Sequence, residues 1–282
     1  MMVPTPALLE QVEQLCECAG VAIMDVYQRR ELWSVTYKSD ASPVTAADMA
    51  AHHILVPGLS RLLPEVPVLS EESALPDFEV RRQWHTYWLV DPLDGTKEFI
   101  NRNDEFTVNV ALIHLGEPVL GVVHVPALLT TYSGIKGEGA RKRSGTWSGN
   151  SPTHQSIRTR GLVPRQAAGL PLEMVASRRH GTEAVQRVKQ RLTGNYGPVT
   201  TRDIGSSLKI CLVAEGEADI YPRLAPTCEW DTAAAQAVVE AAGGAILTDD
   251  FKPLRYNQKL ELLNPHFYVV GDLSIPWRDW LG

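Results

Sequence analysis

The chain has 282 residues, 44% of them hydrophobic and 21% charged, which is typical of a folded soluble protein and excludes a largely disordered one. Lys and Arg number 27 against 33 Asp and Glu, so the net charge is -6. A nucleic acid is therefore not an expected partner. The net charge does not exclude a local basic pocket that binds a small anion.

The cysteines and the N-terminus bear on where the protein works. The four cysteines include no CxxC pair, so neither a zinc cluster nor a disulfide framework is expected. The N-terminus lacks a basic stretch followed by an apolar one, and the most apolar region, residues 107–135, is broken by Gly, Pro and His. We expect a cytoplasmic protein with no signal peptide and no transmembrane segment.

The first residues predict two helices. Apolar residues recur at steps of three and four from Ala7 to Arg30, which is typical of an amphipathic helix. Thr45, with Asp48 three residues later, resembles the capped start of a second helix. Pro57 and Gly58 would kink or divide that helix.

Short apolar runs follow and predict strands. The runs at 67–70 and 87–90 each end in acidic residues, and 107–114, 119–125 and 130–135 are typical of an antiparallel meander. Residues 136–155 are rich in Gly, Ser and charge, which predicts a loop and a domain boundary.

The second half alternates between helices and strands. We expect strands at 174–177, 219–221, 245–247 and 267–270, and helices at 182–192, 206–215 and 232–242. This alternation indicates α/β layering. We therefore expect an N-terminal α+β domain over residues 1–150 and a C-terminal α/β domain over 151–282.

Carboxylates stand where the first two of these strands end. Glu71 and Glu72 follow one strand, and Asp91 and Asp94 end the other. If the strands are neighbours, like charges crowd together unless a cation lies among them. Oxygen ligands of this kind suit Mg²⁺, and two such ions about 3.5–4 Å apart can activate a water for phosphoryl transfer.

Each of these acids also has an ordinary structural interpretation. Asp94-Gly95 is a common turn, and the glutamates could lie on a solvated loop. Asp231 and Asp48 stand where acids stabilise helix starts. His180 follows two arginines in a loop, where it could help to bind an anion. Spacing alone leaves these alternatives open.

Three acidic motifs together resemble a known family. DPLDGTKEF, the upstream LSEES and the downstream EWDTAAAQAVVEAAGG are similar to the inositol-monophosphatase superfamily of Mg²⁺-dependent, lithium-sensitive phosphatases. DGTKEF with Lys97, SPVTAADMAAH, GSSLKICLVAEGEADIYPR and NPHF further resemble its 3'(2'),5'-bisphosphate nucleotidase (CysQ-type) branch. The resemblance implies a fold between α+β and α/β, a layered αβαβα sandwich of the inositol-monophosphatase and sugar-phosphatase type.

The resemblance also assigns metal ligands and catalytic residues. One Mg²⁺ would be held by Glu71, Asp91 and the Leu93 carbonyl, and a second by Asp91, Asp94 and Asp231. Thr96, with Glu71 or Asp48, would orient the attacking water. Asp48 would also face a third, weaker Mg²⁺.

The substrate residues are implied in the same way. Those expected to contact the phosphate that is removed or the nucleotide that is retained are Asp94, Gly95, Thr96, Lys97, Ser177, His180, Ser206, Ser207, Lys209, Arg223 and Asp231. Ala235 stands where the family pattern has Gly, and segment 141–170 is longer than in compact members.

The implied activity removes the 3'-phosphate of adenosine 3',5'-bisphosphate to give AMP and phosphate, in sulfate assimilation or salt tolerance, and extends to the sulfated nucleotide PAPS. The alternatives are an inositol or other sugar phosphatase and an inactive regulatory protein on the same fold. The resemblance leaves open a monomer or a homodimer, and a peripheral location on the inner face of the cell membrane.

Overall fold

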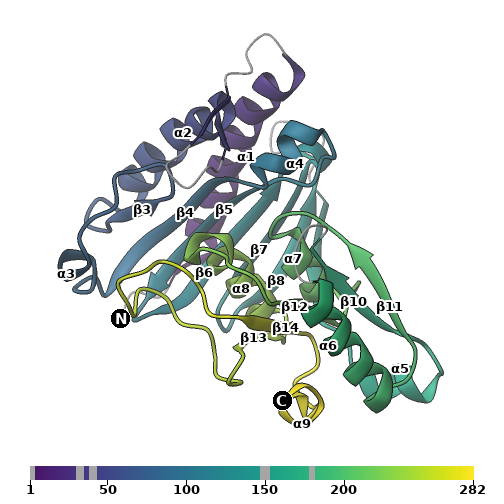
Figure 1. Cartoon of the computed structure of the whole chain (residues 1–282). Coiled ribbons are helices and arrows are strands. Elements are labelled where there is room, and N and C mark those ends of the chain that lie inside the picture. Colours follow the sequence, from purple (N-terminus) through teal and green to yellow (C-terminus); the bar gives the residue numbers. More distant parts are fainter. Residues whose placement is uncertain (1–3, 30–34, 38–42, 147–152, 178–181) are drawn as a thin grey trace.

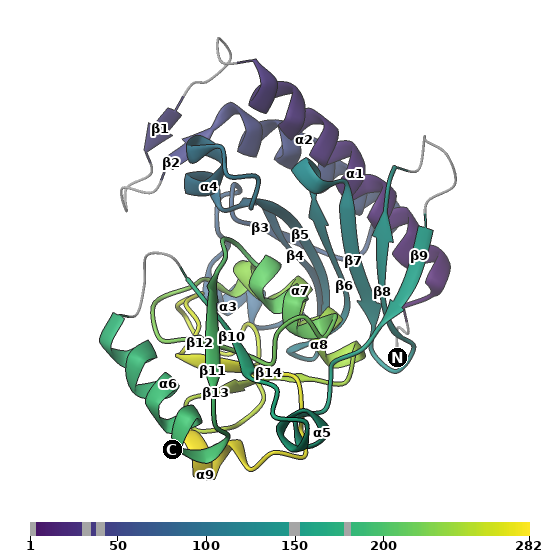
Figure 2. The ribbon, with the colours of Figure 1, turned by 90° about the vertical axis from the view of Figure 1, so that its right-hand side faces the viewer.

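The computed structural model describes residues 4–29, 35–37, 43–146, 153–177 and 182–282. Over these residues the chain forms five layers, in the order helices, sheet, helices, sheet, helices (Figures 1 and 2). The expected αβαβα sandwich is therefore confirmed.

Two long helices form the first layer. Helix α1 (Pro6–Gln28) begins at Thr5, whose hydroxyl accepts the Leu8 N–H, and α2 (Ala46–Leu62) begins at Thr45 with the expected capping box to Asp48. Helix α2 continues through Pro57, so this proline does not divide it. Gly58 packs closely on Leu15 of α1. The two-stranded ribbon of β1 (Val35–Tyr37) and β2 (Pro43–Thr45) lies between these helices in the chain.

Helices α1 and α2 pack on a seven-stranded sheet, counted over the described residues. Its strands, in spatial and sequence order, are β3 (Val68–Ser70), β4 (Thr86–Asp94), β5 (Thr107–His114), β6 (Glu117–Val125), β7 (Thr130–Ile135), β8 (Gly139–Ser144) and β9 (Thr153–Ile157). Strands β3 and β4 are parallel, and every later neighbouring pair is antiparallel. Both faces of β4 are buried, which explains its unbroken apolar run.

The expected loop over residues 136–155 is wrong for much of its length. Strand β8 and the start of β9 occupy it and pair with each other, so the sheet extends to Ile157, past the expected boundary at residue 150. Short helical segments complete this part of the chain: α3 (Phe78–Arg81), α4 (Thr96–Asn101) and η2 (Pro126–Leu128).

Helices α7 (Leu208–Ala214) and α8 (Ala233–Ala241) form the middle layer between the two sheets. Helix α8 lies very close to β6: a Cβ at Gly121 would stand 2.1 Å from the Ala234 carbonyl oxygen. The run of alanines in α8 permits this approach, and Ala235 is buried without difficulty. The close contact brings the start of α8 to the seven-stranded sheet, where the acidic residues lie.

The second sheet has five strands among the described residues, in the order β11 (Val199–Asp203), β10 (Leu172–Ala176), β12 (Ile220–Arg223), β14 (Phe267–Val270) and β13 (Ala245–Thr248). The outer helices are α5 (Leu162–Ala167), α6 (Thr182–Asn195) and α9 (Trp277–Leu281). Three clusters of buried apolar side chains fill the spaces between the layers.

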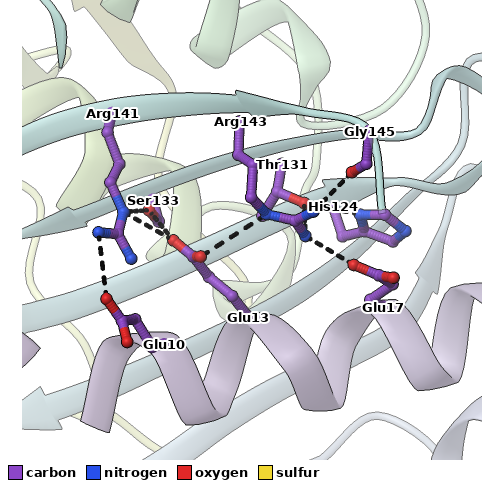
Figure 3. Close-up of polar contacts among 9 residues, drawn as sticks. All are labelled: Glu10, Glu13, Glu17, His124, Thr131, Ser133, Arg141, Arg143 and Gly145. Carbon is purple, nitrogen blue, oxygen red and sulfur yellow. Dashed lines mark hydrogen bonds and ion pairs between the residues drawn. The ribbon is translucent and has the colours of Figure 1, made fainter. Parts of the chain in front are cut away.

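A group of charged side chains joins α1 to β8 beneath the first layer (Figure 3). This α1–β8 cluster consists of Glu10, Glu13, Glu17, Arg141 and Arg143. Both Glu13 and Arg143 are fully buried. A buried cluster of this kind explains why β8 does not have an apolar sequence.

Candidate metal and phosphate site

The ends of β3 and β4 bring the first two acidic motifs together. The strands are parallel, with Ser70 opposite Val90, so the next residues, Glu71 and Asp91, lie side by side at one edge of the sheet. The Glu71 N–H donates to the Val90 carbonyl at 3.1 Å, which fixes this register. Asp91 is only 2% exposed. The neighbouring strand ends that the sequence predicts are confirmed.

An irregularity in strand β4 after Asp91 returns Asp94 to the same place, so the strand extends to Asp94 and no turn follows Asp91. The pairing of β4 with β5 shifts register between these two aspartates, and the Leu93 N–H donates to Asp91 Oδ1 at 2.9 Å. Gly95 has a φ of +92°, a left-handed conformation that favours glycine, and α4 begins at the next residue. The Leu93 carbonyl faces the Thr96 hydroxyl, 3.5 Å away.

The third motif joins this edge from the other half of the chain. Asp231 ends the short helix η3 (Glu229–Asp231), and its Oδ2 accepts the Cys228 N–H at 2.9 Å. Carboxylate oxygens of Asp91, Asp94 and Asp231 all lie within 4.8 Å of one another. Asp231 therefore caps a helix and also belongs to an acidic cluster, so the two interpretations of this residue are compatible.

Charge repulsion shapes this acidic cluster. Burial raises the pKa of Asp91 well above its usual range, and the carboxylates of Glu71, Asp94 and Asp231 raise it further. The pKa of Asp231 is raised in the same way, by burial and then by Asp94 and Glu71. Burial also raises the pKa of Asp94, to about 6. Asp91 is buried, whereas Asp94 and Asp231 are half-buried. Crowded carboxylates of this kind suit a divalent cation such as Mg²⁺.

Asp48 and Thr96 are brought together beside the acidic cluster. The Thr96 hydroxyl donates to Asp48 Oδ1 at 3.3 Å, and Oδ2 accepts the Thr45 N–H at 2.7 Å and the Thr45 hydroxyl at 2.6 Å. Asp48 is 2% exposed, and burial raises its pKa to about 6. The Thr96 hydroxyl is thus held by a fixed carboxylate.

A cavity next to the acidic cluster collects most of the expected substrate residues. Its lining includes Asp94, Lys97, Ser177, Ser206, Ser207, Lys209, Arg223 and Asp231. Gly95 and Thr96 follow Asp94 directly in the chain but are not part of this lining. His180 lies outside the described residues, so its assignment stays a prediction.

Two of these residues, which the resemblance assigns to substrate contact, have their polar groups bound within the chain. Ser207 donates its backbone N–H to Asp94 Oδ2 at 2.5 Å, while its hydroxyl is bound to Thr107 and Asn109. The Lys209 ammonium donates to backbone carbonyls of the preceding turn, at 2.6 and 3.2 Å. Burial lowers the pKa of Lys209 to about 8, although the nearby Asp94 opposes this change.

Sequence patterns miss other residues of the cavity. Thr227 lines it, and its buried hydroxyl has no hydrogen-bond partner among the described residues. Tyr221 and Phe267 line it too, with ring centroids 6.1 Å apart at 89°. Thr227 lies in an irregular loop without periodicity, so only its closeness to Arg223 in the chain could have indicated it.

Comparison with known proteins identifies the family. The model of the inositol monophosphatase family matches residues 7–269. The chain belongs to this family. The family is metal-dependent, typically on Mg²⁺, and the acidic cluster fits that dependence.

The chain is also similar to members of one branch of the family. It is 48% identical to the 3'(2'),5'-bisphosphate nucleotidase CysQ of Escherichia coli K12, over 93% of this chain and 99% of that protein. The CysQ of Haemophilus influenzae is 39% identical over 96% of both chains. The crystal structure of CysQ from Bacteroides thetaiotaomicron has a TM-score of 0.81 at 40% identity, covering 94% of this chain and 97% of that one. The expected family and branch are confirmed.

More distant structures share the fold. The suhB protein of Bartonella henselae has a TM-score of 0.75 at 22% identity, over 97% of both chains. Within the described ranges, no helix combines the length and the apolar character that crossing a membrane requires.

Proposed function

We propose that this protein is a Mg²⁺-dependent phosphomonoesterase that removes the 3'-phosphate of adenosine 3',5'-bisphosphate, giving AMP and phosphate. One observation supports this substrate most directly: a single cavity is lined by Asp94 and Asp231 and also by Lys209 and Arg223. A substrate with two phosphates can place one beside the acidic cluster and the other near Arg223, while Lys209 adds a positive charge to the cavity. The 48% identity to a bisphosphate nucleotidase over nearly the whole chain supports the same assignment.

The donor set fits two Mg²⁺ ions. Glu71, Asp91 and the Leu93 carbonyl would hold one ion, and Asp91, Asp94 and Asp231 the other, with a third facing Asp48. When bound, the metal would neutralise the phosphate and lower the pKa of water. The arrangement of the carboxylates fits this composition, because their mutual repulsion disfavours the ionised cluster until a cation joins it.

The residues of the chain orient the water and hold the substrate. The Thr96 hydroxyl donates a hydrogen bond to Asp48, so its oxygen is left to accept a hydrogen bond from a water molecule. This geometry supports Asp48 as the partner of Thr96. Gly95, Thr96 and Lys97 would contact the phosphate that leaves, because they follow Asp94 directly. Hydrolysis of a phosphomonoester needs little more than such positioning and charge neutralisation.

The retained 5'-phosphate would lie near Arg223, whose Nε is buried without a hydrogen-bond partner among the described residues. Ser177, His180, Ser206, Ser207 and Lys209 would complete the nucleotide region. Because the Ser207 N–H binds Asp94 and the Lys209 ammonium binds backbone carbonyls, these two residues would act mainly by shaping the turn around it. We also propose that the enzyme accepts PAPS as a second substrate, is inhibited by lithium and takes part in sulfate assimilation. We further propose that it works in the cytoplasm as a monomer or a homodimer.

The substrate assignment is tested by comparing kcat/KM for three compounds: adenosine 3',5'-bisphosphate, 3'-AMP and inositol 1-phosphate. We expect the bisphosphate to be strongly preferred. Arg223→Met should lower its kcat/KM about 10- to 100-fold, the value of a charge-assisted hydrogen bond, and should change that of 3'-AMP much less. A preference for inositol 1-phosphate, or an equal loss on both nucleotides, would contradict the assignment and favour a sugar phosphatase.

A further inference from the structure

One turn of the C-terminal half, Ile204–Ser207, lies between the acidic cluster and the loop that follows α4. The Gly205 N–H donates to Glu105 Oε2 at 2.6 Å, a contact between residues 100 positions apart. The carboxylate of Glu105 thus joins the loop after α4, which belongs to the first half of the chain, to a turn of the second half. Neither the acidic motifs nor the cavity lining includes Glu105.

The two backbones are pressed together at this contact. A Cβ on Gly205 would stand 2.5 Å from Glu98 Cγ and 3.0 Å from the Glu105 carbonyl oxygen, so only glycine fits. The next residue, Ser206, has a φ of +47°, a left-handed conformation that is uncommon for a residue other than glycine. Such a conformation persists only where surrounding contacts hold it.

Two charged groups hold the backbone of this turn. Glu105 accepts the Gly205 N–H, and the Lys209 ammonium donates to the carbonyls of Ile204 and Ser206. Hydrogen bonds to ionised groups are the stronger kind, so this pair fixes the direction of the backbone groups between them.

The direction of the Ser207 backbone N–H, at the end of this turn, matters for the acidic cluster. The Ser207 N–H, which follows the held residues, donates to Asp94 Oδ2 at 2.5 Å. The Ser207 hydroxyl is bound to Asn109 Oδ1 at 2.7 Å and to Thr107 Oγ1 at 2.9 Å, both on β5. The hydrogen bond to Oδ2 restricts the orientation of the Asp94 carboxylate beside Asp91 and Asp231.

We propose that Glu105 is a positioning residue of the metal site: through Gly205 it holds the Ile204–Ser207 turn, and through the Ser207 N–H that turn orients Asp94. The inference rests on the acidic site of the proposed function. Groups that orient metal ligands in this way typically change metal affinity or activity by about 10- to 100-fold when they are removed.

The neighbouring residue provides a matched control. Asp104 lies in the same loop, but its Oδ1 accepts the Tyr27 hydroxyl of α1 at 2.7 Å instead of a group of the turn. Asp104→Asn therefore perturbs the same loop and removes one negative charge from it, yet leaves the contact between Glu105 and Gly205 in place.

The experiment measures two properties of the full-length protein that do not depend on turnover. Hydrogen exchange is followed in peptides that cover residues 204–208, and Mg²⁺ affinity is measured by calorimetry. We expect Glu105→Ala to speed exchange in this segment and to weaken Mg²⁺ binding by about tenfold or more. Glu105→Gln keeps an oxygen acceptor and should recover most of the affinity, and Asp104→Asn should match the unaltered protein. In phosphate-release assays, the Mg²⁺ concentration at half-maximal rate should rise more than the substrate KM at saturating Mg²⁺.

The inference is overturned if Glu105→Ala leaves both exchange and Mg²⁺ affinity within twofold of the unaltered protein, or if Asp104→Asn changes both equally. Should Glu105→Ala not fold, Glu105→Asp replaces it, because the shorter side chain keeps the charge but withdraws it from Gly205. If the variants show this pattern but the unaltered protein releases no phosphate from adenosine 3',5'-bisphosphate, the proposed function fails and the positioning role stands. If the unaltered protein hydrolyses the substrate but the variants do not show the pattern, the proposed function stands and the positioning role fails.

Discussion

Two groups of buried carboxylates in this protein differ in how their charge is balanced. In the α1–β8 cluster, Glu13 Oε1 lies 3.0 Å from Arg141 Nε, and Glu17 Oε2 lies 2.9 Å from Arg143 Nη2 (Figure 3). The Ser133 hydroxyl donates to Glu13 as well, at 2.5 Å. The protein supplies its own cations there.

The acidic cluster of Asp91, Asp94 and Asp231 is arranged in the opposite way. Its carboxylates face one another, and burial raises the pKa of all three. Repulsion from neighbouring carboxylates raises the pKa of Asp91 and Asp231 further, whereas Lys209 partly opposes the rise at Asp94. Carboxylates paired with arginines have their counter-charge within the chain, whereas carboxylates that are crowded together suit a cation from outside. The balance of charge, more than burial itself, separates the structural group from the functional one.

The largest expected effect comes from Asp91, which both proposed ions share. Asp91→Asn removes one charge from the acidic cluster, so we expect kcat to fall about 1000-fold, of the order seen when a key electrostatic group is lost. The metal-free variant should fold as well as the unaltered protein, because it loses a repelling charge. Phosphate-release kinetics and circular dichroism check the two statements, and a variant that keeps most of its Mg²⁺-dependent turnover would contradict the site.

Glu13→Ala should produce the opposite result in the α1–β8 cluster. It leaves the buried Arg143 without part of its counter-charge, and breaking a buried pair costs about 3–5 kcal/mol of unfolding free energy. Urea unfolding measures this loss, and kcat of the folded protein should stay within about twofold. Glu10→Ala is the matched control: Glu10 is 47% exposed and lies 3.9 Å from Arg141, so its loss should cost less than about 1 kcal/mol.

Added Mg²⁺ should stabilise the protein through the acidic cluster alone. At a free concentration 100 times the dissociation constant, binding raises the unfolding free energy by about 2.7 kcal/mol. Thermal unfolding with Mg²⁺ and with chelator measures the difference. We expect Glu10→Ala to keep this difference and Asp91→Asn to lose most of it; an unchanged difference in Asp91→Asn would place the ion elsewhere.

A smaller effect should be seen in the pH dependence of the metal-free protein. The pKa of Asp48 and of Asp94 is raised from 3.8 to about 6, so between these values the folded protein binds more protons than the unfolded chain. Stability contributed by these groups is present below 3.8 and is lost as the pH rises through about 6. Urea titrations across this range should show that loss with chelator and a much smaller one with saturating Mg²⁺. Equal slopes under both conditions would contradict the assignment.

Local patterns predict much of the acidic cluster and little of what orients it. Asp91 and Asp94 follow an apolar strand, and the capping box at Thr45 and Asp48 is a short-range signal; both are confirmed. The contact of Glu105 with Gly205 and the direction of the Lys209 ammonium arise from packing between distant segments. No pattern within a few residues of either position indicates them.

The α1–β8 cluster explains why the sequence did not predict strand β8. In β8, the side chains of Arg141 and Arg143 enter the space that apolar residues usually fill, because Glu13 and Glu17 of α1 meet them there. The sequence of β8 therefore resembles a charged loop. The acidic residues that pair with these arginines lie on α1, more than 120 positions earlier in the chain. A pattern within one segment of the sequence does not contain such a distant pairing, so it does not predict β8.

In the proposed function, a crowded acidic cluster whose charge is balanced by an added cation performs the hydrolysis. The most direct measurement is phosphate release from adenosine 3',5'-bisphosphate by protein that has been treated with chelator and then supplied with Mg²⁺. We predict no detectable release before the addition, full release after it, and no recovery for Asp91→Asn. Release that proceeds equally well without Mg²⁺, or that Mg²⁺ restores equally to Asp91→Asn, would contradict the claim.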